Sequence, residues 1–438
     1  MTLIDLTSTV TRSLRLDNLP VAIIGAGPIG LAAAANLVER GIDFVVYEAG
    51  DTVASSLASW GHIRLFSPWR HLIDPAARRL LAVAGWTEPD QDVAPCGAQL
   101  VDRYLAPLAA LPEIRSRIRL RATVQAVTRQ GMDRTRSLGR SAVPFQLRVL
   151  HDSGEITEVT ARAVIDASGT YSTPNPLGSN GLDPLGLAEV ADRISHALPD
   201  VLGRDRPRFA GRHTAVVGAG HSAANTLITL AKLAVEEHGT TVTWLIRNDT
   251  AARVSASEDD ELRGRASLGE RVRRLVDSGA IAVIDGFEII RVARTPHGVD
   301  IAGSRRGAVA HVDADLIVAA TGFRPNLEML REVRLDLDEI VEAPRRLAPL
   351  IDPNVHSCGT VEPHGFAELQ QPEPNFFIAG MKSYGRAPTF LLATGYEQVR
   401  SIVAWLDGDM ANASAVQLTL PSTGVCSTGD ASVQSCCS

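Results

Sequence analysis

Two glycine-rich segments have the spacing that holds the phosphates of a dinucleotide. In the first, Gly25, Gly27 and Gly30 lie between an apolar run and a segment with helical periodicity. In this pattern the first glycine permits a tight turn, the second lets the backbone approach a pyrophosphate, and the third lets helix and strand pack closely. Pro28 stands near the predicted helix start, where its missing N–H is harmless. Glu48 ends the next apolar run, where a carboxylate would accept hydrogen bonds from ribose hydroxyls.

The second segment repeats this pattern two hundred residues later, with Ala223 in place of the third glycine. The strand predicted after it ends in Arg247, where an acid would repel a 2′-phosphate and an arginine would pair with it through two hydrogen bonds. This favours NADPH over NADH, although Arg247 could also be an ordinary surface arginine. A Thr-Gly turn after a further buried strand completes the predicted nucleotide site. Its residues are Gly218, Gly220, His221, Ser222, Ala223, Arg247, Thr321 and Gly322.

The elements that must position these residues form two similar β-α-β units. Apolar runs and periodicity predict strand, helix and strand over 21–25, 28–40 and 43–48, and again over 214–218, 221–237 and 241–246. Single strands are predicted over 117–127 and 280–292, and a final helix over 390–406. The fold class is therefore α/β, with two Rossmann-like dinucleotide-binding domains. We place the first dinucleotide-binding domain at 1–207 and 326–410, with an insertion at about 55–112 and a connector at about 172–207. The NADPH-binding domain is placed at 208–325, and a Cys-containing tail at 411–438.

Composition excludes several other classes of protein. The 438 residues carry 43 basic and 50 acidic side chains, a net charge of −7, with no basic block of the kind that binds nucleic acid or anionic membranes. No apolar stretch is long enough to predict a membrane span. The first twenty residues lack the apolar core of a secretion signal, and five cysteines are too few for a disulfide scaffold. We therefore expect a cytoplasmic protein with no nucleic-acid or membrane partner, and keep a homodimer as the candidate assembly.

The cysteines argue against one chemistry and suggest another. Residues 49–95 and 209–325 contain no cysteine, so no vicinal thiol pair lies where a disulfide reductase of this architecture needs one. Three thiols on a tail could instead trap a thiophilic centre such as trivalent arsenic, although they could also be unremarkable exposed thiols. A fourth could receive the trapped centre, or be a small buried residue. The candidate capture residues are Cys426, Cys436, Cys437 and Cys358. No resident metal is predicted.

The order of these motifs resembles the two-dinucleotide-domain flavoproteins, a group that includes thioredoxin reductase-like enzymes and flavin-containing monooxygenases. Residues 59–60 and 65–68 are similar to a segment of flavoprotein monooxygenases from arsenic-resistance operons that runs along the isoalloxazine ring. The resemblance covers about residues 20–406 and implies FAD at the first glycine segment and NADPH at the second. The FAD-binding residues that it implies, together with the glycine motif, are Gly25, Gly27, Pro28, Gly30, Glu48, Ser59, Trp60, Arg64, Ser67, Val124, Ala167, Ser168, Gly169, Gly380 and Thr389.

The leading hypothesis is an NADPH-dependent FAD monooxygenase that acts on O₂ and a small molecule. The flavin would be reduced, form a C4a-hydroperoxide and transfer oxygen to a soft lone pair, for which no general base is needed. A trivalent arsenical oxidised to the pentavalent form is the specific substrate that we expect, and the catalytic chemistry is flavin-centred with no side chain assigned to it. Two alternatives stay open: a reductase or oxidase acting on a metal ion, quinone or oxygen, and a flavin-bound redox or metal sensor.

Overall fold

The computed structural model describes residues 16–248, 263–352, 363–387 and 390–418. Within these residues the chain forms two compact units, which are described separately. The first comprises the described residues up to 172 and those from 325 onward, and the second comprises those from 173 to 324. The second unit thus begins at 173, whereas the sequence predicted its start at 208. The reason is that strand β8 (Ile194–His196) pairs with strand β15 (Leu316–Ala319) of the second unit.

A five-stranded parallel sheet is the centre of the first unit. Its strands are short, and those at its centre are fully buried, which suits apolar runs covered on both faces. The strands, in spatial order, are β16 (Phe376–Ile378), β7 (Ala163–Asp166), β1 (Val21–Ile24), β2 (Phe44–Tyr47) and β3 (Ile118–Arg119). This order brings strands from the two ends of the chain together around β1.

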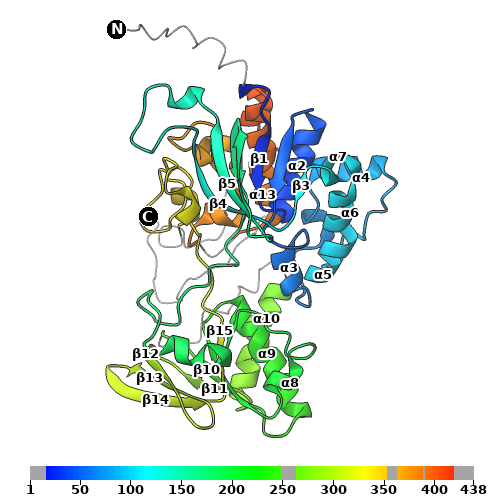
Figure 1. The fold of residues 1–438 in the computed structure, drawn as a ribbon. Helices are drawn as coiled ribbons and strands as arrows, with labels where there is room; N and C mark the ends of the chain where they lie inside the picture. Colours follow the sequence, from blue (N-terminus) through cyan, green and yellow to red (C-terminus); the bar gives the residue numbers. More distant parts are fainter. Residues whose placement is uncertain (1–15, 249–262, 353–362, 388–389, 419–438) are drawn as a thin grey trace, which may run out of the picture. The chain divides into compact units, whose positions relative to one another are not determined.

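The two faces of this sheet are covered by different layers, as the alternation along β1 shows. Val21 and Ile23 share a buried cluster with helices α2 (Pro28–Glu39) and α13 (Leu392–Leu406). Ala22 and Ile24 share another with strands of an antiparallel sheet, β4 (Ala122–Arg129), β5 (Phe145–His151) and β6 (Ile156–Ala161). The unit is therefore a three-layer structure of helices, parallel sheet and antiparallel sheet (Figure 1).

Residues 55–112, predicted as an insertion without strong periodicity, form a series of short helices. Most are four or five residues long, which is too short to show a helical repeat in the sequence. They are α3 (Ser55–Ser59), η2 (Trp69–His71), α4 (Pro75–Val83), α5 (Gly97–Leu100), the π-helical turn η3 (Val101–Leu105), α6 (Ala106–Ala110) and, directly after, α7 (Pro112–Arg115). Several of them pack against α2 and its neighbours in the first cluster.

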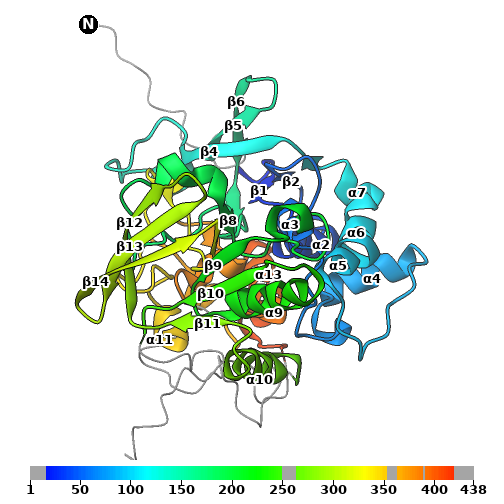
Figure 2. The same ribbon diagram turned by 90° about the horizontal axis from the view of Figure 1, so that it is seen from below.

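The second unit repeats the same plan. Its parallel sheet has the order β11 (Ala282–Ile284), β10 (Thr241–Leu245), β9 (His213–Val217), β15 and β8. Helix α9 (His221–Glu236) packs on β9 and β10, and α10 (Arg263–Asp277) packs on α9 (Figure 2). The antiparallel sheet of this unit consists of β12 (Phe287–Arg294), β13 (Val299–Arg305) and β14 (Ala308–Ala314). The predicted α/β fold with two Rossmann-like domains is confirmed.

Both units turn sharply where the sequence predicts one continuous strand. The predicted strand 117–127 breaks at Arg121 and the predicted strand 280–292 breaks at Gly286, each in the left-handed region with φ of 52° and 58°. In each unit the residues before the break join the parallel sheet and those after it start the antiparallel sheet. The prediction of single strands is therefore wrong, because apolar alternation continues through a turn that changes the sheet.

The remaining helical turns are short and lie between the larger elements. They are η4 (Arg140–Ala142), η5 (Leu187–Arg193), α8 (Arg206–Phe209), η7 (Glu328–Leu330), α11 (Ala348–Ile351), α12 (Phe366–Leu369), η8 (Gly380–Tyr384) and α14 (Met410–Ser414). Among the residues described, no helix has the length and apolar character needed to cross a membrane.

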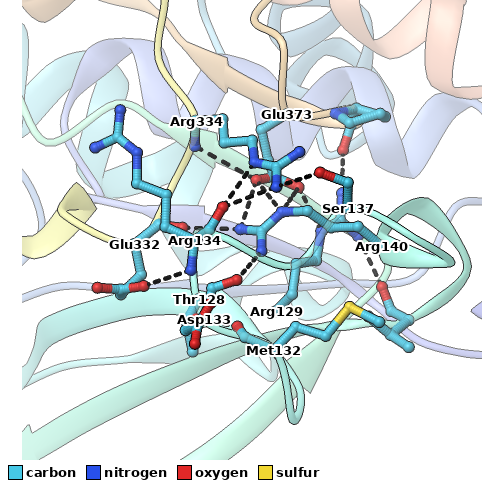
Figure 3. A network of polar contacts seen from close by, with 12 residues as sticks. Thr128, Arg129, Met132, Asp133, Arg134, Ser137, Arg140, Glu332, Arg334 and Glu373 are labelled. Carbon is cyan, nitrogen blue, oxygen red and sulfur yellow. Dashed lines mark hydrogen bonds and ion pairs between the residues drawn. The ribbon is translucent and has the colours of Figure 1, made fainter.

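A buried ion network joins the antiparallel sheet of the first unit to the segment before β16. Arg129 Nε donates to Glu373 Oε1 at 2.8 Å, and Arg140 Nε donates to Glu373 Oε2 at 2.8 Å. Figure 3 shows both guanidinium groups turned toward this carboxylate. Burial alone would raise the pKa of Glu373, but the hydrogen bonds from Arg140 and Arg129 hold it below its ordinary value. Removing one partner would leave a buried, unpaired charge. The network therefore stabilises the contact between the antiparallel sheet and the segment before β16.

Candidate functional site

Each of the three glycines in the first turn lies in a different environment, so glycine is needed there for different reasons. Gly25 has a φ of 97°, and a Cβ there would lie 2.8 Å from the carbonyl oxygen of Ala167. A Cβ on Gly30 would lie 1.9 Å from the carbonyl oxygen of Gly25. A Cβ on Gly27 would meet no atom within 4 Å. The fold itself therefore requires Gly25 and Gly30, whereas Gly27 leaves an open cradle at the N-terminus of α2 that fits a bound pyrophosphate.

The carboxylate of Glu48 holds this turn. Its Oε2 accepts a hydrogen bond from the Ala26 N–H at 2.7 Å, and its Oε1 accepts from the Gly50 N–H at 2.8 Å and from Ser55 Oγ at 3.1 Å. A carboxylate has about four acceptor positions, so one remains for another donor. The neighbouring Tyr47 is buried, which raises the pKa of its phenol. The ribose contact of Glu48 stays a prediction.

The ends of three parallel strands bring distant predicted residues to this turn. The Ala167 N–H donates to the Ile24 carbonyl at 2.9 Å, and the Ala379 N–H donates to the Asp166 carbonyl at 2.9 Å. Residues 167–169 and Gly380 thus lie at the same sheet edge as Gly25. A Cβ on Gly380 would lie 3.0 Å from Ile29 Cγ1, because the start of η8 packs on the first turn of α2. The structure therefore gathers both later FAD segments around the first glycine turn.

The other residues predicted to bind FAD lie in several places. Helix α3 starts beside the glycine turn, since the Ala54 N–H donates to the Ala26 carbonyl at 3.0 Å. Near it Ser59 is exposed, Trp60 is half-buried, and Arg64 donates to the Ala94 carbonyl; Ser67 is half-buried, and Val124 is buried in β4. Their contacts with a flavin stay predictions. Thr389 lies outside the described residues.

The second glycine turn has the same geometry. Gly218 has a φ of 123°, and a Cβ there would lie 2.1 Å from the Ala320 carbonyl oxygen, whereas a Cβ on Gly220 would meet no atom within 4 Å. Ala223 is buried in the first turn of α9, which also includes His221 and Ser222. Trp244 Nε1, in β10, donates to the Gly218 carbonyl at 2.6 Å. This turn is therefore a second open cradle. The hydrogen bond from Trp244, a residue that the sequence did not indicate, holds it in place.

The predicted Thr-Gly turn is held by an asparagine that the sequence analysis did not identify. The Asn175 side chain donates to the Thr321 carbonyl at 3.1 Å, and Thr321 Oγ1 donates to the Asn175 carbonyl at 2.7 Å. The Asn175 N–H also donates to the Gly322 carbonyl at 2.9 Å. Thr321 and Gly322 directly follow Ala320, which lies against Gly218. Both predicted residues therefore lie at the edge of the second cradle.

Arg247 is exposed two residues after β10, on the side of the sheet where the second glycine turn lies. Replacement of Arg247 by Ala is expected to lower kcat/KM for NADPH about tenfold and to change that for NADH little, because an exposed charge pair with a 2′-phosphate is screened. Steady-state kinetics with both nucleotides measures this. Arg212→Ala is the matched control, since this exposed arginine precedes β9 at the opposite sheet edge. Equal losses with both nucleotides would contradict the 2′-phosphate role.

Comparison with known proteins identifies the family. Residues 22–357 match the family described as pyridine nucleotide-disulphide oxidoreductase. The chain belongs to this family. It is therefore an oxidoreductase that uses a pyridine nucleotide, which agrees with the predicted pair of cofactors, FAD and NADPH. The individual residues assigned to each cofactor remain predictions.

The relatives are distant and of more than one activity. The chain is 28% identical over 231 residues to the indole-3-pyruvate monooxygenase of Oryza sativa subsp. japonica, which is 52% of this chain and 47% of that protein. The chain thus spans about half the length of the curated relatives it matches. A bacillithiol disulfide reductase from Bacillus cereus has a TM-score of 0.66 at 20% identity, covering 89% of this chain and 99% of that one. The FAD-bound cadaverine monooxygenase from Erwinia amylovora has a TM-score of 0.62 at 12% identity, covering 94% and 99%. These structures establish the fold.

The positions of the cysteines bear on whether the chain could relay electrons through a disulphide. Neither 49–95 nor 209–325 contains a cysteine, and Cys96, at the start of α5, is a free thiol. Among the described residues no group of histidine, cysteine or acidic side chains could hold a metal ion. The four candidate capture residues, Cys358, Cys426, Cys436 and Cys437, lie outside the described residues.

Proposed function

We propose that the chain is an NADPH-dependent FAD monooxygenase that oxygenates a small, soft nucleophile. The observation that carries this proposal is the pair of open cradles at Gly27 and Gly220 in a chain with no thiol pair between them. Two nucleotide sites would supply and receive hydride, and the missing thiols favour oxygen over a disulphide as the acceptor. Its monooxygenase relatives in plants, matched over about half their length, support the same conclusion.

Bound FAD would accept hydride from NADPH and, once reduced, activate O₂ for transfer to a substrate. The residues of this chain would bind and orient the cofactors. Glu48 would keep the Ala26 N–H fixed at the first turn, so that the free N–H groups of α2 face the pyrophosphate. Trp244 would hold the Gly218 carbonyl and keep the second turn open. Oxygen transfer to a lone pair needs no general base, which agrees with the lack of an assigned catalytic side chain.

A trivalent arsenical, oxidised to the pentavalent form, is the substrate that we propose within this class. Support comes from the sequence: thiolates bind thiophilic centres, and Cys426, Cys436 and Cys437 provide three of them near the chain's end. The resemblance of residues 59–68 to flavoprotein monooxygenases of arsenic-resistance operons points the same way. We also propose a cytoplasmic location and a homodimer.

The test follows NADPH absorbance, oxygen uptake and peroxide together, with and without a trivalent arsenical. The proposal expects stimulated NADPH loss, matching oxygen uptake, little peroxide and a pentavalent product. Slow oxidation that ends in peroxide whatever arsenical is added would instead indicate an oxidase, and turnover with a quinone or metal ion a reductase. Negligible turnover with every acceptor would indicate a redox or metal sensor.

Replacement of Cys426, Cys436 and Cys437 together by Ser is expected to raise the apparent KM for the arsenical about tenfold while kcat at saturation stays unchanged, because serine removes the soft ligands. Steady-state oxygen uptake against arsenical concentration measures this. Cys96→Ser is the matched control, since Cys96 is the N-cap residue of α5 and serine is favoured at that position. Unchanged kinetics in the triple variant would contradict capture by these thiols.

A further inference from the structure

One of the two lysines in the chain is buried at the first nucleotide site. The side chains of Lys382 and Asp166 are 1% and 0% exposed, and Lys382 Nζ lies 2.6 Å from Asp166 Oδ2. Lys382 Nζ also donates to Ser168 Oγ at 3.1 Å, and Ser168 Oγ donates to Asp166 Oδ1 at 2.7 Å. The three side chains form a closed network with a buried cation and a buried anion.

This network lies directly behind the first glycine turn. Asp166 ends β7, and the residues after it lie close to Gly25. A Cβ added to Gly25 would lie 2.8 Å from the Ala167 carbonyl oxygen and 3.0 Å from Ser168 Cα. Lys382 belongs to η8, which starts at Gly380 on the first turn of α2. The ion pair is therefore built into the edge of the sheet where the phosphates of FAD are proposed to bind.

The buried charges of Asp166 and Lys382 determine how this sheet edge interacts with a negatively charged dinucleotide. A carboxylate buried behind a pyrophosphate site repels a bound dinucleotide, since buried charges are poorly screened. We propose that Lys382 is a positioning residue that neutralises Asp166 and so permits tight FAD binding and easy flavin reduction. Through Ser168 it also fixes the turn at 167–169 against Gly25. This inference rests on the proposed function, because it takes FAD as the cofactor of the first turn.

The test compares Lys382→Met, Asp166→Asn and the double variant. Lys382→Met leaves a buried anion and is expected to weaken FAD binding to the apoprotein about tenfold or more and to make the flavin reduction potential more negative. Asp166→Asn removes that anion and is expected to leave FAD affinity unchanged or tighter and to make the potential more positive. The double variant is expected to return both quantities toward the wild-type values. FAD titration of the apoprotein and potentiometry of the bound flavin measure both.

Two controls separate this role from a merely structural one. Lys232→Met removes the other lysine, which is exposed in the second unit, and is expected to change neither quantity. Lys382→Arg keeps the charge and is expected to restore most of the affinity that Lys382→Met loses. Shifts of the same sign in Lys382→Met and Asp166→Asn, or a double variant weaker than both, would overturn the inference. Wild-type protein that binds no FAD would overturn the proposed function as well.

Discussion

Replacement of Gly27 by Ala is expected to lower the affinity for FAD about 30- to 100-fold while the melting temperature of the apoprotein stays unchanged. Gly27 has φ of −77° and ψ of −173°, an extended conformation that alanine adopts without strain. Its added methyl group would meet no protein atom within 4 Å. It would instead occupy the space of the pyrophosphate, and overpacking of this kind costs about 2–3 kcal/mol, which corresponds to that loss of affinity.

Fluorescence titration of the apoprotein with FAD measures the affinity, and thermal denaturation without FAD measures the stability. Gly30→Ala is the informative comparison, because its methyl group would lie 1.9 Å from the Gly25 carbonyl oxygen. That variant is expected to destabilise the apoprotein itself. A Gly27→Ala protein that binds FAD like the wild type would show that the pyrophosphate does not lie at this turn.

The matching substitution in the second unit, Gly220→Ala, is expected to raise KM for NADPH about 30- to 100-fold and to leave bound FAD unchanged. Gly220 has φ of −94° and ψ of −177°, and a Cβ would again meet no atom within 4 Å. The methyl group therefore obstructs only the nucleotide, at the same cost of about 2–3 kcal/mol.

Steady-state kinetics over NADPH concentration measures this effect, and the flavin absorbance of the purified protein measures bound FAD. Gly27→Ala and Gly220→Ala act as controls for each other, since each changes one turn. If Gly220→Ala loses FAD, or if Gly27→Ala alone raises KM for NADPH, the assignment of the two turns must be reversed.

Features close together in the sequence could be predicted. The glycine spacing, the helices α2 and α9 and the strands around them are all encoded within about thirty residues, where periodicity and turn residues decide the structure. Glu48 could be predicted in the same way, although in the structure its carboxylate holds the glycine turn. The breaks at Arg121 and Gly286 were missed, because the apolar pattern runs on through each of them.

Contacts between distant segments could not be predicted from one sequence. Lys382 and Asp166 are 216 positions apart, and only the strand order β16-β7-β1 brings them together. Asn175 and Thr321 are 146 positions apart and meet at the start and end of the second unit. The rarity of lysine, two among 43 basic residues, was the one available signal for Lys382. This rarity did not indicate which residue Lys382 would contact.

The most direct test of the central claim is a single-turnover experiment. The purified protein is reduced without oxygen by one equivalent of NADPH per FAD and is then mixed with isotopically labelled O₂ and a trivalent arsenical. The account predicts that one equivalent bleaches the flavin completely and that one labelled oxygen atom per FAD enters the product. A requirement for a second equivalent of NADPH, as a protein disulphide would impose, or recovery of all labelled oxygen as peroxide, would contradict it.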